Sequence, residues 1–319
     1  MSSINSKART VSLLTSMLLN ASVCTAADDF SIGIIGPVLN RSHYDTALRQ
    51  AINGTDDENL AFVVVNGIKS AQEACSDDLY LIRKKLFETA KNGLVVSLAG
   101  TDWTECKTTA GKSSSMDRLS RLRELFFAED FSFGASKIPL AHQSAEVKYR
   151  SYAENVRWEL GPILFATINL PSDNNHFLSA GGRNSEFEDR SVANRNWLRH
   201  LVAHAAAHKL DALVLFCDHD PLDPPRSGKQ HDGFAQIRKY IEGIASHFSG
   251  RILLVHGAPT PLTGSPAGIS WHGNLGSLSV PSGWLRLNIA PNSPTPFSVI
   301  SNEASEIVRN KNQKAAALR

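Results

Sequence analysis

Five short apolar runs, each ending on a polar or glycine turn, constrain the fold of this 319-residue chain more than any other feature. The runs are FSIGI, FVVV, LVVSL, ALVLFC and ILLV. They are apolar throughout rather than alternating, which is typical of parallel strands covered on both faces. Together with a sixth run, ILFATINL, they predict strands over residues 30–36, 60–65, 94–98, 163–170, 212–217 and 251–256.

Segments with helical periodicity separate these runs, and this alternation indicates crossover helices and an α/β fold. Ser76-Asp77-Asp78 is a typical N-cap sequence for a helix that would end near Asn92-Gly93. Two further helices are expected over residues 191–209 and 233–249. Beyond the last run the pattern changes to short alternating segments, which predict antiparallel strands that close the sheet over 277–280, 284–290 and 297–301.

The first 27 residues have the pattern of a secretory signal peptide. Lys7 and Arg9 precede an apolar stretch over 11–23, which is too short for a transmembrane helix, and small residues up to Ala27 offer a cleavage site. Cys24 leaves a lipoprotein anchor as an alternative. We therefore expect a signal peptide (1–27), a globular domain (28–302), a polar tail (303–319), no membrane span and a secreted, periplasmic location.

The charge balance and the cysteines indicate which partners and which cellular compartment to expect. Cleavage would leave 31 basic and 31 acidic residues, because Lys7 and Arg9 are lost from 33 and no acidic residue is lost. This balance argues against a nucleic-acid partner. Cys75 and Cys106 each lie a few residues beyond a predicted strand, so we expect them to form a disulfide in an oxidising compartment, while Cys217 ends an apolar run and is expected to be a buried thiol.

The order of several segments resembles a secreted bacterial branch of the calcineurin-like metallophosphoesterases. The resemblance covers residues 30–301 and rests on FVVVNGIKSAQEACSDDLYLIRKKLF, VVSLAGTDWTEC, YAENVRWELGPILFATINLPSDNN, ANRNWL and LLVHG. It implies a four-layer α/β/β/α sandwich with a two-metal centre at the carboxyl ends of the strands. It also implies the Cys75–Cys106 pairing, since that branch has cysteines at both positions. Two divalent cations in such a centre activate a water that attacks a phosphate ester.

Most of the metal ligands that this resemblance implies are replaced. Gly36-Pro37, Asn66-Gly67 and the turn 99–102 stand where the family has Gly-Asp or Gly-Asp-Asn-Glu, and His256 alone persists from the last motif. Proline, glycine and threonine cannot supply a bridging carboxylate. We therefore expect a protein that has lost two-metal phosphatase activity and binds a small polar or phosphate-bearing ligand, or an envelope protein, without a metal cofactor.

The polar residues that remain after the strands suggest an alternative, a divergent phosphoesterase with one metal. Asp218, His219 and His256, with Asp220 beside them, could hold one zinc, manganese or iron ion, and Asp102 could act as a general base or a further oxygen ligand. Equally, these residues could be ordinary loop residues that bond to the backbone. Candidate ligand contacts at the rim are Asn66, Asn174 and Asn175.

The asparagines after the fourth predicted strand and a repeat of three histidines both have simpler explanations than ligand or metal binding. A turn over 171–174 explains Asn174 and its neighbours without a ligand, and we favour that interpretation. His200, His204 and His208 repeat at four-residue spacing, which is the spacing of a metal clamp on a helix, but a solvated or partly packed helix face explains them as well and is the interpretation we favour. The sequence contains no Gly-x-Ser-x-Gly motif, which argues against a serine hydrolase of that type.

Overall fold

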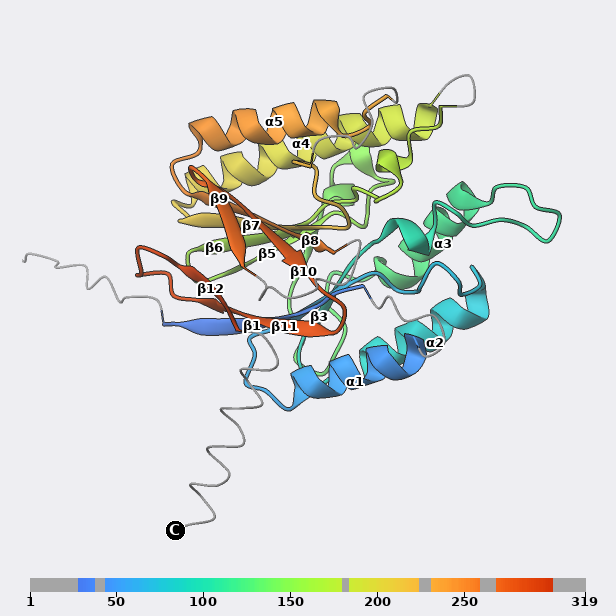
Figure 1. Cartoon of the computed structure of the whole chain (residues 1–319), viewed down its shortest axis with the longest axis horizontal. Helices are drawn as coiled ribbons and strands as arrows, with labels where there is room; N and C mark the ends of the chain where they lie inside the picture. Colours follow the sequence, from blue (N-terminus) through green and yellow to red (C-terminus); the bar gives the residue numbers. More distant parts are fainter. Residues whose placement is uncertain (1–27, 38–43, 180–183, 224–230, 259–267, 301–319) are drawn as a thin grey trace, which may run out of the picture.

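The computed structural model describes residues 28–37, 44–179, 184–223, 231–258 and 268–300. The predicted signal peptide (1–27) and the predicted tail (303–319) lie outside these residues. Two β-sheets lie face to face, and helices cover the outer face of each sheet (Figure 1). The expected α/β/β/α sandwich is therefore confirmed.

The first sheet has five strands in the order β12-β11-β1-β2-β3. The parallel part consists of β1, β2 and β3, while β11 pairs antiparallel with β1, and β12 pairs antiparallel with β11. The strand bounds are Phe30–Ile35 (β1), Val63–Asn66 (β2), Leu94–Ser97 (β3), Trp284–Ile289 (β11) and Phe297–Ile300 (β12).

The second sheet has seven strands in the order β4-β5-β6-β7-β8-β10-β9. Strands β6, β7, β8 and β10 are parallel. The bounds are Ala141–His142 (β4), Val156–Leu160 (β5), Ile163–Thr167 (β6), Ala212–Cys217 (β7), Arg251–Gly257 (β8), Ile269–His272 (β9) and Leu275–Val280 (β10).

One strand prediction was only partly right. We expected 277–280 to be antiparallel, and β10 is antiparallel to β9 but parallel to β8. The reason is that β9, which the sequence analysis missed, lies at the sheet edge and forms an antiparallel hairpin with β10. The chain therefore has already turned round once before it pairs with β8.

The helices form the two outer layers. On the first sheet lie α1 (Tyr44–Asp56) and α2 (Asp77–Glu88), with α3 (Ser115–Phe126) packed beside α2 (Figure 1). On the second sheet lie α4 (Ser185–Ala207) and α5 (Ala235–His247). Short 3₁₀ helices occupy Gly100–Asp102, Gln143–Ala145, Val147–Tyr149 and Asn174–His176. Among the described residues no helix is both long and apolar enough to span a bilayer.

Aromatic side chains fill the space between the two sheets. Phe62, just before β2, packs edge-on against Trp158 and Phe165 of the second sheet, with ring centroids 5.4 and 4.9 Å apart. Trp158 also stacks on Phe216 at 6.1 Å. Such ring pairs add to the stabilisation that burial of their surface already gives, so the two sheets are fixed relative to each other.

Strand alternation divides the residues of β7 between two cores. Val214 and Phe216 face the first sheet, whereas Leu213, Leu215 and Cys217 belong to the core between the second sheet and the helices α4 and α5. This follows from the period of two along a strand. The face on which a strand-end residue emerges is therefore fixed by its position in the strand.

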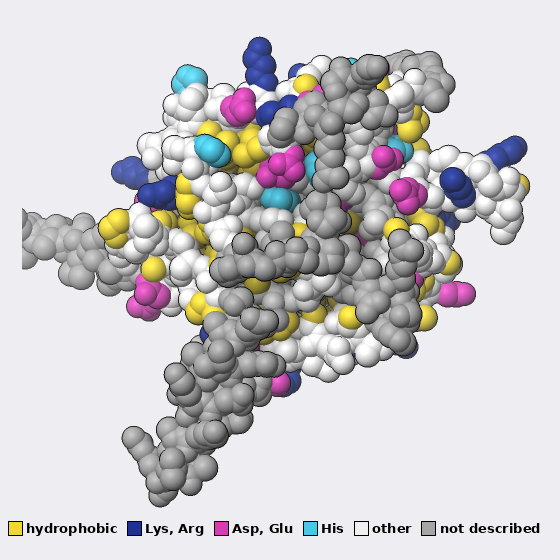
Figure 2. Space-filling view, in the orientation of Figure 1, with side chains coloured by type: hydrophobic (Ala, Val, Ile, Leu, Met, Phe, Trp, Pro, Cys, Tyr) yellow, Lys and Arg dark blue, Asp and Glu magenta, His cyan; other side chains and the backbone are white. Residues whose placement is uncertain are grey.

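The predicted disulfide is present. Cys75 and Cys106 are bonded, with their Cα atoms 5.8 Å apart, and they join the loop after β2 to the loop after β3. Cys217 is a buried free thiol, as expected. On the described part of the face in Figure 2, basic and acidic side chains are interspersed rather than gathered into one basic patch.

Candidate functional site

The carboxyl ends of the parallel strands of both sheets meet at one edge of the sandwich. The Nδ2 of Asn66, at the end of β2, donates to the carbonyl of Cys217, at the end of β7, over 3.3 Å. A Cβ at Gly257, the last residue of β8, would lie 3.0 Å from Asn66 Nδ2 and 3.1 Å from Pro37. We call this region the carboxyl edge, and it contains most of the residues predicted as a site.

Asp102 lies at the carboxyl edge but is fully buried. Its Oδ1 accepts hydrogen bonds from the backbone N–H groups of Ile68 (2.8 Å) and Lys69 (3.0 Å), and its Oδ2 accepts from Ala99 (2.9 Å). Burial raises the pKa of Asp102 to about 6, although these bonds and the charge of Lys69 oppose the rise. The carboxylate holds the loop after β2 against the loop after β3, so its position argues for a structural role rather than that of a general base.

Asp218 joins the two sheets. Its Oδ2 accepts hydrogen bonds from the backbone N–H groups of Gly100 (2.7 Å), beyond β3, and Ser172 (2.8 Å), beyond β6. The side chain is buried, and its backbone carbonyl accepts from the N–H of Gly257 over 3.1 Å. A carboxylate with two backbone donors on one oxygen is well satisfied without an ion.

Asp220, His256 and Ser277 form a buried polar group. Ser277 Oγ donates to Asp220 Oδ2 over 2.7 Å, while Nε2 of His256 lies 3.0 Å from Ser277 Oγ and 3.3 Å from Asp220 Oδ2. Burial alone would raise the pKa of Asp220, but the hydrogen bonds and charge of His256 lower it to about 2. Since the serine proton is directed to the carboxylate and not to the imidazole, this arrangement does not activate a serine nucleophile.

The structure does not bring Asp218, His219 and His256 together as ligands. His256 pairs with Cys217 across β7 and β8, so its side chain lies on the face covered by the helices, whereas Asp218 emerges on the face toward the first sheet. The ring of His219 packs on Phe234 at the start of α5, 4.8 Å between centroids, and burial lowers the pKa of His219. The expected single-metal arrangement therefore requires side chains from two faces of the same sheet.

Asn66 and Ser97 are two of the polar residues near the carboxyl edge that each have a buried side-chain atom without a hydrogen-bond partner; Ser70 and Asn169, in the segments after β2 and β6, are others. Asn66 and Ser97 are paired in register across β2 and β3, so their side chains leave the sheet on the same side. Within the described chain, Oδ1 of Asn66 and Oγ of Ser97 are buried and have no hydrogen-bond partner. The sequence analysis singled out Asn66 but missed Ser97, which could have been noticed as the one polar residue of the strand LVVS.

Asn174 and Asn175 are occupied by the fold rather than free at the rim. Both residues and His176 have positive φ (42°, 55° and 53°), a conformation that is costly for residues other than glycine. Asn174 bonds to the backbone of His231 and Gly233, and Nδ2 of Asn175 donates to Gly233. The turn that we favoured over 171–174 is consistent with the hydrogen bond from the N–H of Asn175 to the carbonyl of Pro171 (3.1 Å).

Arg190, which the sequence analysis missed, fixes this strained turn. The guanidinium is fully buried and donates to Oδ1 and the carbonyl of Asn175 (2.5 and 2.8 Å), to the carbonyl of Asn169, and to Glu186. Burial alone would raise the pKa of Glu186, but the charge of Arg190 and the hydrogen bond of His176 lower it to about 2. Asn175 thus belongs to a buried ionic network, whereas Asn174 beside it is bonded to the backbone of His231 and Gly233.

No protein-family model matches the chain, and no curated protein matches it either. Among solved structures, the chain is similar to the crystal structure of a phosphatase from Mycoplasma pneumoniae. The TM-score is 0.41 at 8% sequence identity, and the similarity covers 86% of this chain and 92% of the other.

Proposed function

We propose that the protein is an exported, calcineurin-like phosphoesterase-fold protein that lacks two-metal phosphatase activity and binds a small polar or phosphate-bearing ligand at the carboxyl edge. The observation that carries this proposal is the engagement of Asp102 and Asp218. Five backbone N–H groups donate to these two carboxylates. A two-metal centre needs several free oxygen and imidazole ligands facing one space.

The state of His256 supports the same conclusion. It is the one residue that the resemblance retains from the last metal motif, and it is buried against Asp220 and Ser277 on the helix side of the second sheet. To reach Asp218, the imidazole would have to leave this hydrogen-bonded group and cross to the other face of the sheet. Loss of these buried bonds would cost on the order of 1–3 kcal/mol for each group left unpaired.

Binding is supported by Asn66 and Ser97. A buried polar atom without a partner is unfavourable by about 1–3 kcal/mol, so a ligand that bonds to Oδ1 of Asn66 and Oγ of Ser97 would recover that free energy. Oδ1 of Asn66 can only accept, which suits a hydroxyl group of a sugar or a protonated phosphate oxygen, whereas the hydroxyl of Ser97 can donate to a phosphate oxygen. The two side chains lie where parallel strands of α/β folds commonly place their ligands.

Two assays test the proposal. We expect no turnover of p-nitrophenyl phosphate in the presence of Mn²⁺, and saturable binding of phosphate monoesters in equilibrium dialysis that falls roughly tenfold in Asn66→Ala and in Ser97→Ala, the effect of losing about 1.4 kcal/mol. Asn288→Ala is the matched control, because Asn288 is a strand asparagine of the same sheet that bonds to Ser31 instead. Manganese-dependent turnover, or equal binding by all variants, would contradict the proposal.

A further inference from the structure

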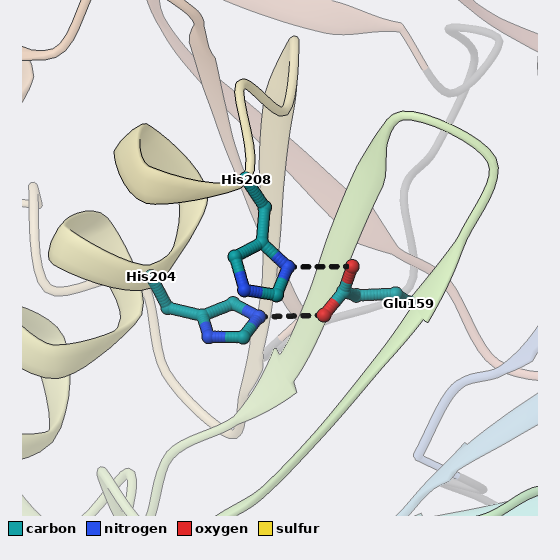
Figure 3. Close-up of side chains that lie close together, drawn as sticks. All are labelled: Glu159, His204 and His208. Carbon is teal, nitrogen blue, oxygen red and sulfur yellow. Dashed lines mark hydrogen bonds and ion pairs between the residues drawn. The ribbon is translucent and has the colours of Figure 1, made fainter.

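A group of two histidines and a glutamate lies far from the carboxyl edge. His204 is in the last turn of α4, His208 is the residue that caps this helix, and Glu159 is on β5, next to the hairpin that leads into β6. All three side chains point toward one another (Figure 3). One ligand atom from each lies within 4.8 Å of the others, and among the described residues no other group of three His, Cys, Asp or Glu side chains does so.

The distances within this group suit a shared ion. Nε2 of His204 lies 2.5 Å from Oε1 of Glu159, and Nδ1 of His208 lies 3.5 Å from Oε2. Ligand atoms about 2.0–2.2 Å from a tetrahedral zinc ion are themselves about 3.4 Å apart. The His208–Glu159 distance already has this value, and the His204–Glu159 pair would have to open by about 1 Å.

Nε2 of His204 faces two groups with opposite requirements. Nη1 of Arg157 lies 2.8 Å from this nitrogen and can only donate, whereas the carboxylate of Glu159, 2.5 Å away, can only accept. One ring nitrogen carries either a proton or a lone pair and therefore satisfies only one of them. If Arg157 turned away, a cation between His204 and Glu159 could bind both the imidazole lone pair and the carboxylate.

We propose that His204, His208 and Glu159 form a binding site for one divalent transition-metal ion of the type that accepts imidazole ligands, with Zn²⁺ as the probe. Two imidazoles and a carboxylate are a common zinc ligand set that leaves a fourth position for water. The end of a helix also favours a cation, because its last carbonyl groups carry partial negative charge.

The proposal concerns two residues of the histidine repeat, which lie on a partly packed to solvated helix face as the favoured interpretation has it. Glu159, a strand residue remote in sequence, completes the group. His200 is one turn earlier on the same helix, is half exposed and lies 3.5 Å from Glu146 instead. It is therefore a matched control of the same residue type on the same helix, with an exposure close to that of His208. A metal at the site would join the end of α4 to β5 and stabilise the folded chain.

The test is a zinc titration of the full chain, produced without a metal-binding tag and stripped with chelator. We expect one zinc per chain at this site in equilibrium dialysis, and affinity roughly tenfold or more lower in His204→Gln, His208→Gln and Glu159→Gln, since even outer partners of metal sites are worth 10–100-fold. His200→Gln should bind as the wild type does. Zinc should raise the melting temperature of the wild type and of His200→Gln, but not of His208→Gln.

Substitution of Arg157 should change the zinc affinity in the opposite direction. Arg157→Leu removes the cation that competes for Nε2 of His204, so this variant should bind zinc more tightly than the wild type. Far-ultraviolet circular dichroism shows whether each variant is folded. We expect the variants to fold, because all three ligand side chains are partly exposed. Failure of the wild type to bind zinc up to millimolar concentration, equal binding by the ligand variants and His200→Gln, or weaker binding by Arg157→Leu would each overturn the proposal.

Discussion

Asp102 illustrates how a carboxylate at the end of a strand can be committed to the fold. Three backbone N–H groups from two loops point at its two oxygens, and the residue has no exposed surface. Backbone donors in loops have no helix or sheet partner, so a carboxylate that accepts from several of them fixes both loops at once. Asp218 does the same between the two sheets.

Replacement of Asp102 should have a pH-dependent effect on stability. Asp102→Asn places an Nδ2 group against the N–H of Ala99, which leaves a buried donor unpaired and costs about 1–3 kcal/mol. Because burial raises the pKa of Asp102 from 3.8 to about 6, the wild type binds more protons when folded and loses stability as the pH rises from about 4 to about 6. The free energy of unfolding of the wild type should therefore exceed that of Asp102→Asn by more at pH 4 than at pH 7, and the excess should change by roughly 2–3 kcal/mol between the two pH values.

Urea unfolding of both proteins at the two pH values measures this difference. Asp220→Asn is a useful control, since the pKa of Asp220 is lowered to about 2 and its stabilisation should be lost as the pH falls from about 4 to about 2. If the difference in free energy of unfolding between wild type and Asp102→Asn grew as the pH rose, the raised pKa of buried Asp102 would be contradicted.

Substitution of Arg190 should lower the stability of the fold more than most single substitutions do. Arg190→Met leaves the carboxylate of Glu186 and the strained turn at Asn175 without their common partner, and loss of one member of a buried ion pair typically costs about 3–5 kcal/mol. Arg49→Met is the comparison, because the Arg49–Asp45 pair is about half exposed and should be worth under about 1 kcal/mol. Denaturant unfolding of the two variants would measure both costs, and similar values would be evidence against this role.

At the scale of elements, the loops after β2 and β3 are joined twice, by Asp102 and by the Cys75–Cys106 disulfide. The cysteines are 31 residues apart, so the chain-entropy model predicts that the disulfide stabilises the fold by roughly 3–4 kcal/mol. Cys75→Ser/Cys106→Ser should unfold at correspondingly lower denaturant concentration, while addition of reductant should destabilise the wild type and leave the double variant unchanged. Equal sensitivity of both proteins to reductant would contradict the prediction.

The sequence predicted elements better than it predicted which side chains meet. Apolar runs and caps located the main parallel strands, α2, α4 and α5, because burial on both faces and the 3.6-residue period are local patterns. The face on which a strand-end residue emerges depends on register. Cys217 and His256 are paired and face the helices, while Asp218, one residue further, faces the other sheet. Grouping Asp218 with His256 ignored this alternation.

Long-range partners were also outside the reach of sequence reasoning. The four-residue spacing of His204 and His208 was visible, but Glu159 comes from a strand 45 residues earlier than His204. Ser97 became meaningful only once its pairing with Asn66 was known. Strand β9 was missed because it is short and half exposed, and without it the parallel pairing of β10 with β8 was not expected.

At the scale of the whole molecule, the two proposals concern two separate regions, one at the carboxyl ends of the parallel strands and one near their amino ends. The carboxyl edge holds Asn66 and Ser97 beside carboxylates that are already hydrogen-bonded. The Glu159–His204–His208 group lies where α4 ends and the chain enters β7 from its amino end. Since the two regions share no residues, a metal bound at the second says nothing about catalysis at the first.

The most direct test of the central claim is metal analysis of a chain without the second region. His204→Gln/His208→Gln, incubated with Mn²⁺ or Zn²⁺ and dialysed, should contain no stoichiometric metal and should not hydrolyse phosphate esters, because Asp102, Asp218 and His256 are held by internal hydrogen bonds. About two metal ions per chain, with ester hydrolysis, would contradict the account and restore a two-metal centre at the carboxyl edge.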